Sequence, residues 1–69
     1  MLKSKLLTPS EVSDILKVNY RKVLEMILLG DLPAFQIGRQ YRVDESELEN
    51  YLSKNKVKGF YHYGNPQTN

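Results

Sequence analysis

Three neighbouring side chains, Tyr20, Arg21 and Lys22, have the types that bind phosphate groups and the hydrogen-bonding edges of bases. Asn19 precedes them and can cap a helix, because its short side chain accepts hydrogen bonds from the exposed N–H groups of a first turn. A helix that begins there presents its positive dipole end and these cations together. The chemistry indicated is anion binding combined with recognition of base edges.

These side chains lie in a segment with the pattern of one amphipathic helix. At about 100° per residue, a helix here has an apolar face with Val23, Met26 and Ile27 and a charged face with Arg21, Lys22 and Glu25. Gly30 is expected to end the helix, because a residue without Cβ adopts the left-handed conformation at low cost. One face is expected to pack, and the other is free to bind.

A second helix is predicted to precede this one. Thr8 is its N-cap, Pro9 takes the first helical position, and Glu11 completes a capping box. Ser10 lies in the first turn. We expect this helix to end at about Lys17.

The stripe expected to be buried on this helix consists of Val12, Ile15 and Leu16. Ser13 is expected to face water or a phosphate. Two interpretations of the helix pair stay open at this point. It is either a helix-turn-helix or an ordinary helical hairpin with a solvated basic face.

A β-hairpin is predicted after Pro33. Phe35, Ile37, Tyr41 and Val43 alternate with polar or small residues, as in half-buried strands, and Gly38 supplies the turn. Arg39 and Gln40 are then at the tip of the hairpin, and Arg42 is on its outer face. These residues could lie over a nucleic-acid backbone.

A third helix is predicted from about Glu45 to Ser53, capped by Asp44 and packed through Leu48, Tyr51 and Leu52. Its acidic residues near the N-terminus interact favourably with the positive end of the helix dipole and are interpreted as structural and solvated. Arg42 has an alternative role here, as the partner of a salt bridge to this acidic helix.

The charge is polarised along a chain of 69 residues whose net charge is only +2. Residues 17 to 42 carry five cations and two carboxylates, whereas residues 44 to 49 carry four carboxylates and no cation. This distribution is expected of a domain with one side that faces phosphate. Its length allows one small domain.

Catalysis is not expected. The sequence has no cysteine, a single histidine at His62, and no glycine-rich phosphate loop, so it lacks the usual nucleophile, acid–base and metal sets. We therefore expect no catalytic residue, cofactor or metal. No apolar run approaches the roughly 20 residues that cross a bilayer, so the expected compartment is the cytoplasm.

The sequence divides into a domain at residues 1–53 and a basic, aromatic tail at 54–69, which is expected to be flexible. The tail contains Lys54, Lys56 and Lys58 as candidate DNA contacts and an aromatic run at residues 60–63. Three interpretations of that run stay open: it packs on the domain, stacks on nucleic acid, or binds a protein partner.

Several motifs occur in the order of a known family. They are Leu7-Thr8-Pro9-Ser10-Glu11-Val12, Leu16-Lys17-Val18-Asn19, Gly30-Asp31-Leu32-Pro33-Ala34, Ile37-Gly38-Arg39-Gln40-Tyr41-Arg42-Val43 and Leu48-Glu49-Asn50-Tyr51-Leu52. Through them, residues 6 to 52 resemble the excisionase-type DNA-binding domain, a small relative of the MerR winged helix. The resemblance implies a mainly α fold, a winged helix-turn-helix of three helices and a two-stranded wing.

The resemblance also implies a protein that binds double-stranded DNA in the cytoplasm of a bacterium, phage or mobile element. Members of this size act as recombination directionality factors that help an integrase excise an element, and others regulate transcription. Carried over by position, the DNA contacts are Ser10, Asn19, Tyr20, Arg21, Lys22, Glu25, Arg39, Gln40 and Arg42. Implied partners are a tyrosine or serine integrase, through the tail, and further copies on adjacent sites.

Some positions depart from the family pattern. Lys22 stands where the family commonly has a small or hydroxyl-bearing residue, and Glu25 stands where it often has a basic residue. Glu25 therefore either accepts a hydrogen bond from cytosine N4 or holds the Arg21 or Lys22 side chain in place. Leu28 and Leu29 replace polar residues and either contact a neighbouring copy or pack on the lead-in or tail. A further hypothesis of another class is a protein-interaction adaptor with a basic face.

Overall fold

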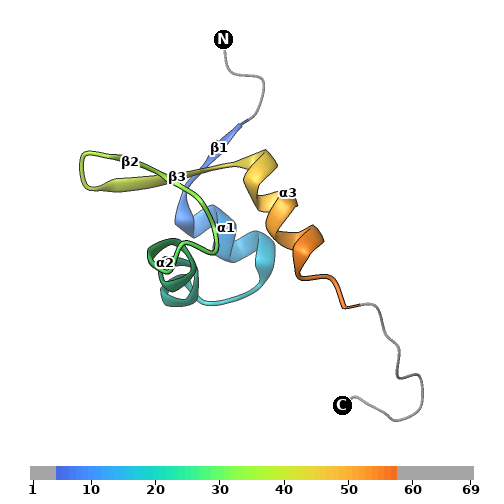
Figure 1. The fold of residues 1–69 in the computed structure, drawn as a ribbon. Coiled ribbons are helices and arrows are strands. Elements are labelled where there is room, and N and C mark those ends of the chain that lie inside the picture. The colour runs from blue at the N-terminus through green and yellow to red at the C-terminus, as the bar shows by residue number, and fades with distance from the viewer. Residues whose placement is uncertain (1–4, 58–69) are drawn as a thin grey trace.

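The computed structural model describes residues 5–57 and contains three helices and three short strands in that range (Figure 1). In chain order the elements are β1 (Leu6–Leu7), α1 (Pro9–Leu16), α2 (Tyr20–Leu28), β2 (Phe35–Ile37), β3 (Gln40–Asp44) and α3 (Glu45–Lys54). The three predicted helices and the predicted hairpin are confirmed within one or two residues at their ends. The arrangement is that of a winged helix-turn-helix.

Local capping determines where α1 begins. The Thr8 hydroxyl accepts from the Glu11 N–H at 3.0 Å, and the Glu11 carboxylate accepts from the Thr8 N–H at 2.9 Å. This reciprocal pair is the predicted capping box. The helix ends at Leu16, because Lys17 adopts the left-handed conformation with φ of 61° and its N–H donates to the Ser13 carbonyl.

The limits of α2 are also set locally. The Asn19 side-chain oxygen accepts from the Lys22 N–H at 2.8 Å, as expected of the N-cap. After the helix, Gly30 has φ of +84°, and the next N–H, of Asp31, donates to the Met26 carbonyl at 2.9 Å. The predicted glycine stop is therefore confirmed.

The sheet has one strand more than the predicted two-stranded wing. Its order is β1-β3-β2, and both pairings are antiparallel. β2 pairs with the first part of β3, so that Phe35 lies opposite Arg42, whereas β1 pairs with its end, where Leu7 lies opposite Val43. The lead-in residues are thus part of the sheet, and we use the term wing for β2, β3 and the turn between them.

The register corrects the expectation that Phe35, Ile37, Tyr41 and Val43 share one half-buried face. Directly opposed residues in an antiparallel pair point to the same face, so Phe35 and Ile37 lie with Arg42 on the face opposite that of Val43. Val43 is fully buried, whereas Phe35 and Ile37 are 56% and 60% exposed. Only the Val43 face meets the helices.

The core is built from every element except β2. Its buried members are Leu7, Val12, Val23, Met26, Leu32, Val43 and Leu48. Two expectations for α1 are wrong. Ile15 is 52% exposed, and Ser13 is buried with its hydroxyl donating to the Ser10 carbonyl at 2.8 Å. The buried stripe of α1 therefore runs through Pro9, Val12 and Ser13, not through Ile15.

Candidate nucleic-acid interface

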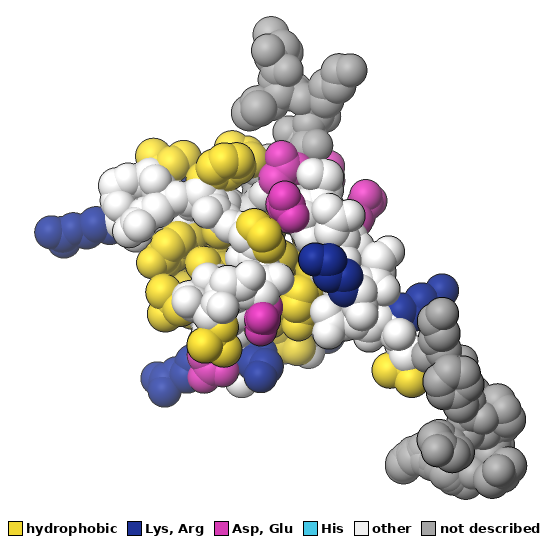
Figure 2. Space-filling view, in the orientation of Figure 1, with side chains coloured by type: hydrophobic (Ala, Val, Ile, Leu, Met, Phe, Trp, Pro, Cys, Tyr) yellow, Lys and Arg dark blue, Asp and Glu magenta, His cyan; other side chains and the backbone are white. Residues whose placement is uncertain are grey.

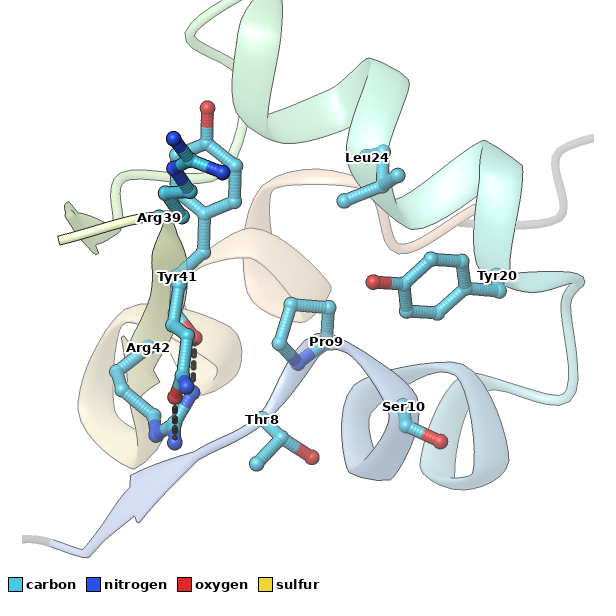
Figure 3. Close-up of a pocket in the computed structure, with 9 residues that line it drawn as sticks. Thr8, Pro9, Ser10, Tyr20, Leu24, Arg39, Tyr41 and Arg42 are labelled. Carbon is cyan, nitrogen blue, oxygen red and sulfur yellow. Dashed lines mark hydrogen bonds between the residues drawn. The ribbon is translucent and has the colours of Figure 1, made fainter. Parts of the chain in front are cut away.

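One groove joins three parts of the chain that are distant in sequence. The start of α1, the front half of α2 and the tip of the wing surround a hollow of about 420 Å³ (Figure 3). Its lining consists of Thr8, Pro9, Ser10, Tyr20, Leu24, Arg39, Gln40, Tyr41 and Arg42. The structure therefore gathers Ser10, Tyr20 and the three predicted wing residues around one space.

The front of α2 presents its side chains to solvent. Tyr20, Arg21 and Lys22 are all exposed, while Val23 behind them is fully buried. Asn19 is exposed and uses its side-chain oxygen to cap the helix. Because an N-terminal turn directs N–H groups and a positive dipole end outward, this surface favours negatively charged groups.

Glu25 lies on the exposed side of α2 and pairs with a neighbour on the same helix. Its carboxylate lies 3.9 Å from the Lys22 ammonium, and the two side chains are 56% and 60% exposed. A solvated pair at this spacing contributes little to stability. The pair with Lys22 is present in the structure, and the role of Glu25 as an acceptor from cytosine N4 stays a prediction.

The two arginines of the wing differ in their surroundings. Arg39 follows Gly38, whose φ of +63° makes the turn, and is exposed at the tip. The Arg42 guanidinium donates from Nη1 to the Tyr41 carbonyl at 2.8 Å and from Nη2 to Gln40 Oε1 at 2.7 Å (Figure 3). Arg42 is thus half-buried and held by its own strand.

The alternative salt bridge from Arg42 to the third helix does not form in the described residues, since none of Glu45, Glu47 and Glu49 pairs with it. Figure 2 shows acidic side chains gathered near the start of α3, and basic side chains projecting from the wing tip and from α2. The polarity expected from the sequence is present on the surface.

The Glu11 carboxylate at the start of α1 is structural. The backbone hydrogen bond from Thr8 lowers the pKa of Glu11 below its ordinary value of 4.5, with smaller contributions in the same direction from the Thr8 hydroxyl, Lys5 and Arg42. The group is therefore ionised at neutral pH and occupied by its cap. It adds a negative charge next to the groove without being free to bind a ligand.

The tail lysines are placed away from the groove or outside the described residues. Lys54 is the last residue of α3, one residue beyond the predicted helix end, and lines a separate hollow with Tyr51. Lys56 is exposed just after the helix. Lys58 and the aromatic run at 60–63 lie outside the described residues.

Four groove residues are not among the DNA contacts predicted from the sequence: Thr8 and Pro9, which were expected only to start the first helix, and Leu24 and Tyr41. Leu24 follows Tyr20 by four residues, a spacing that places both on one side of a helix and could have indicated it. Tyr41 was assigned to the core on its alternation with Val43. It is only half-buried, because the groove opens at its end of the strand.

The fold has two helices joined by a three-residue turn, and a wing lies beside the exposed front of the second helix. The sequence of residues 6–56 matches the model of one protein family. The chain belongs to the helix-turn-helix domain family. In this family of folds the second helix of the pair enters the major groove of DNA. In this helix-turn-helix protein, that helix is α2.

The helix-turn-helix chain also resembles proteins of two bacteria. It is 43% identical over 50 residues to YvgK of Bacillus subtilis, an uncharacterised protein. It is 34% identical over 50 residues to MT0521 and Rv0500A of Mycobacterium tuberculosis, each named as a candidate DNA-binding protein. The match spans 72% of this chain but 16% of the Bacillus protein and 64% of the mycobacterial ones.

No solved structure matches the chain. Within residues 5–57, none of the helices has the length and apolar character to span a membrane. Over the same range, no three metal-ligating side chains come together.

Proposed function

We propose that this protein binds double-stranded DNA sequence-specifically and without catalysis, as an excisionase-type factor that helps an integrase excise a mobile element. The observation that carries the DNA-binding part is the groove, which joins the front of α2 to the tip of the wing. A helix and a wing on the same side can contact a major groove and the neighbouring backbone at once.

Each part of the interface has a proposed role. Tyr20 and Arg21 contact base edges in the major groove, where arginine can bind guanine through two hydrogen bonds. Arg39 enters the adjacent narrow groove or binds its phosphates. Ser10, in the first turn of α1, donates to a phosphate. Lys22 supplies charge from the side of α2, with its position set by Glu25.

The second wing arginine has a supporting role in this proposal. Arg42 and Gln40 are hydrogen-bonded to each other, so they stiffen the strand that follows Arg39, and Arg42 contributes a fixed positive charge. A rigid wing loses less conformational entropy on binding than a free one.

A single copy is expected to bind DNA weakly, so the proposal includes an assembly of copies on adjacent sites. About four cations face the proposed DNA side, and four phosphate contacts give a slope of roughly −3 to −4 in log K against log salt. Leu29 at the end of α2 is 76% exposed and is not packed on the lead-in residues that the structure describes. It is available to a neighbouring copy.

The excision role, in a bacterial, phage or mobile-element cytoplasm, rests on the resemblance of residues 6 to 52 to excisionases. The names of the mycobacterial relatives support DNA binding in general. A small transcription regulator would use the same α2 and wing surface, so the experiment must separate the two roles by the location of the binding sites.

The test is a gel shift of the full chain on tiled fragments from its own genomic neighbourhood, at two salt concentrations. A ladder of salt-sensitive complexes beside an integrase gene or attachment site supports excision. A shift confined to a promoter replaces excision by transcription regulation. Absence of any shift at low salt rejects DNA binding and leaves the adaptor hypothesis.

A further inference from the structure

A row of apolar side chains runs along the exposed side of α2. Tyr20, Leu24 and Leu28 follow one another at a spacing of four, which aligns them on one side of a helix. Tyr20 is 51% exposed, Leu28 is 71% exposed, and Leu24 is half-buried against the groove. The core side of the same helix is separately occupied by Val23 and Met26.

Tyr20 and Leu24 lie within the candidate DNA surface, and Leu28 continues the row along α2 beyond the groove. Figure 3 shows Tyr20 and Leu24 projecting from α2 into the hollow that the wing residue Arg39 and the α1 residue Ser10 also line. Arg21 lies beside the row on the helix. An apolar row among arginines and a hydroxyl is complementary to a polyanion that also carries apolar groups.

The acidic residue on this side of α2 is already paired. Glu25 follows Leu24, and its carboxylate is drawn to the Lys22 ammonium at 3.9 Å. The Lys22 ammonium offsets part of the negative charge that Glu25 would bring close to phosphates beside the row. It therefore permits close approach of the leucines to DNA.

The apolar group that a major groove presents on its base edges is the C5-methyl of thymine. We infer, on the basis of the proposed function, that Leu24 and Leu28 determine specificity by packing against thymine methyl groups. The DNA site of this protein then has T·A pairs at the positions under the row. Arg21, beside the row, selects a neighbouring guanine.

The probe for the test is a short duplex selected by the full chain from a random-sequence pool. In that duplex, each thymine is replaced in turn by deoxyuridine, which removes the methyl group and keeps the base pair and the sugar. At a contacted position, we expect binding to become about fourfold weaker, which corresponds to the free energy of burying one methyl group.

The matched variants are Leu24→Ala and Leu28→Ala. Each is expected to weaken binding to the thymine duplex and to abolish the effect of deoxyuridine at one position. Leu28 is exposed, so its variant keeps the fold even where Leu24→Ala does not, and Leu24→Met serves as the conservative control at the other position.

Equal losses on thymine and deoxyuridine duplexes would place the leucines on deoxyribose or on a second copy, and would overturn the inference while leaving DNA binding intact. Insensitivity of the parent protein to every deoxyuridine would do the same. Failure to select any duplex rejects the proposed function itself, and the inference with it.

Discussion

Arg42 donates to the side-chain oxygen of Gln40 at 2.7 Å along strand β3, while its other terminal nitrogen donates to the backbone of the same strand. Two residues predicted as separate DNA contacts therefore form one unit. Arg39, which directly precedes Gln40 in the turn, stays exposed at the tip. The two arginines should respond differently to the same substitution.

Arg42→Lys keeps the charge but loses the forked geometry, because an ammonium does not reproduce two fixed donors. We expect unfolding free energy to fall by about 1 kcal/mol and the salt dependence of DNA binding to stay unchanged. Arg39→Lys is the matched control and should leave stability as it is. Urea unfolding of both variants measures the difference, and equal stabilities would contradict the structural role of Arg42.

Lys17 has φ of 61° in the turn between α1 and α2, a conformation that costs a residue with a Cβ about 1 to 2 kcal/mol. Lys17→Gly should remove that cost and stabilise the protein by roughly 0.5 to 1 kcal/mol, after the greater entropy of glycine in the unfolded chain is allowed for. Lys17→Ala keeps the Cβ and should give no gain. The midpoint of urea unfolding for the two variants decides between the outcomes.

Arg21 and Lys54 are both exposed cations, but only Arg21 lies on the front of α2, and Lys54 ends α3. Arg21→Ala should cost about 1 to 3 kcal/mol on the selected duplex and much less on random DNA. Lys54→Ala should weaken binding to both duplexes by a similar small factor. Titrations on the two duplexes test this, and equal effects of both variants on specific and random DNA would reject the roles assigned.

Ile37 and Val43 are both β-branched strand residues on opposite faces of the sheet. Ile37 is 60% exposed, so Ile37→Thr should change stability by less than about 0.5 kcal/mol. Val43 is fully buried, and Val43→Thr places a hydroxyl in the core at a cost of roughly 1 to 3 kcal/mol. Thermal unfolding of the two variants tests the pairing of β2 with β3. A large loss of stability in Ile37→Thr would contradict that pairing.

The lowered pKa of Glu11 makes the capping box sensitive to acid. Because the pKa is lower in the folded state, the carboxylate stabilises the fold above its ordinary value of 4.5, and this contribution is lost as the pH falls through the lowered value. Glu11→Gln should therefore melt below the parent protein at neutral pH and approach it in acid. The melting temperatures of both proteins, measured from neutral to acid pH, test this prediction. A difference in melting temperature that does not change with pH would show that the Glu11 charge is not its cause.

The sequence by itself determined the features that depend on near neighbours. The caps at Thr8 and Asn19 and the stop at Gly30 each involve atoms within a few residues, so their signals are present in short stretches of chain. These ends and the apolar spacing between them predict the helices and the hairpin, and the resemblance of residues 6 to 52 to a known family added the winged helix-turn-helix class.

The tertiary structure alone decided which faces are buried and which side chains meet. The pairing of Leu7 with Val43 joins residues 36 positions apart. A two-residue strand is too short to show the alternating pattern from which a strand is predicted. The pairing of β2 with β3, in which Phe35 lies opposite Arg42, places Phe35 on the face away from the core. Burial of a side chain depends on contacts between distant segments, and the geometry of those contacts exists only once the chain has folded.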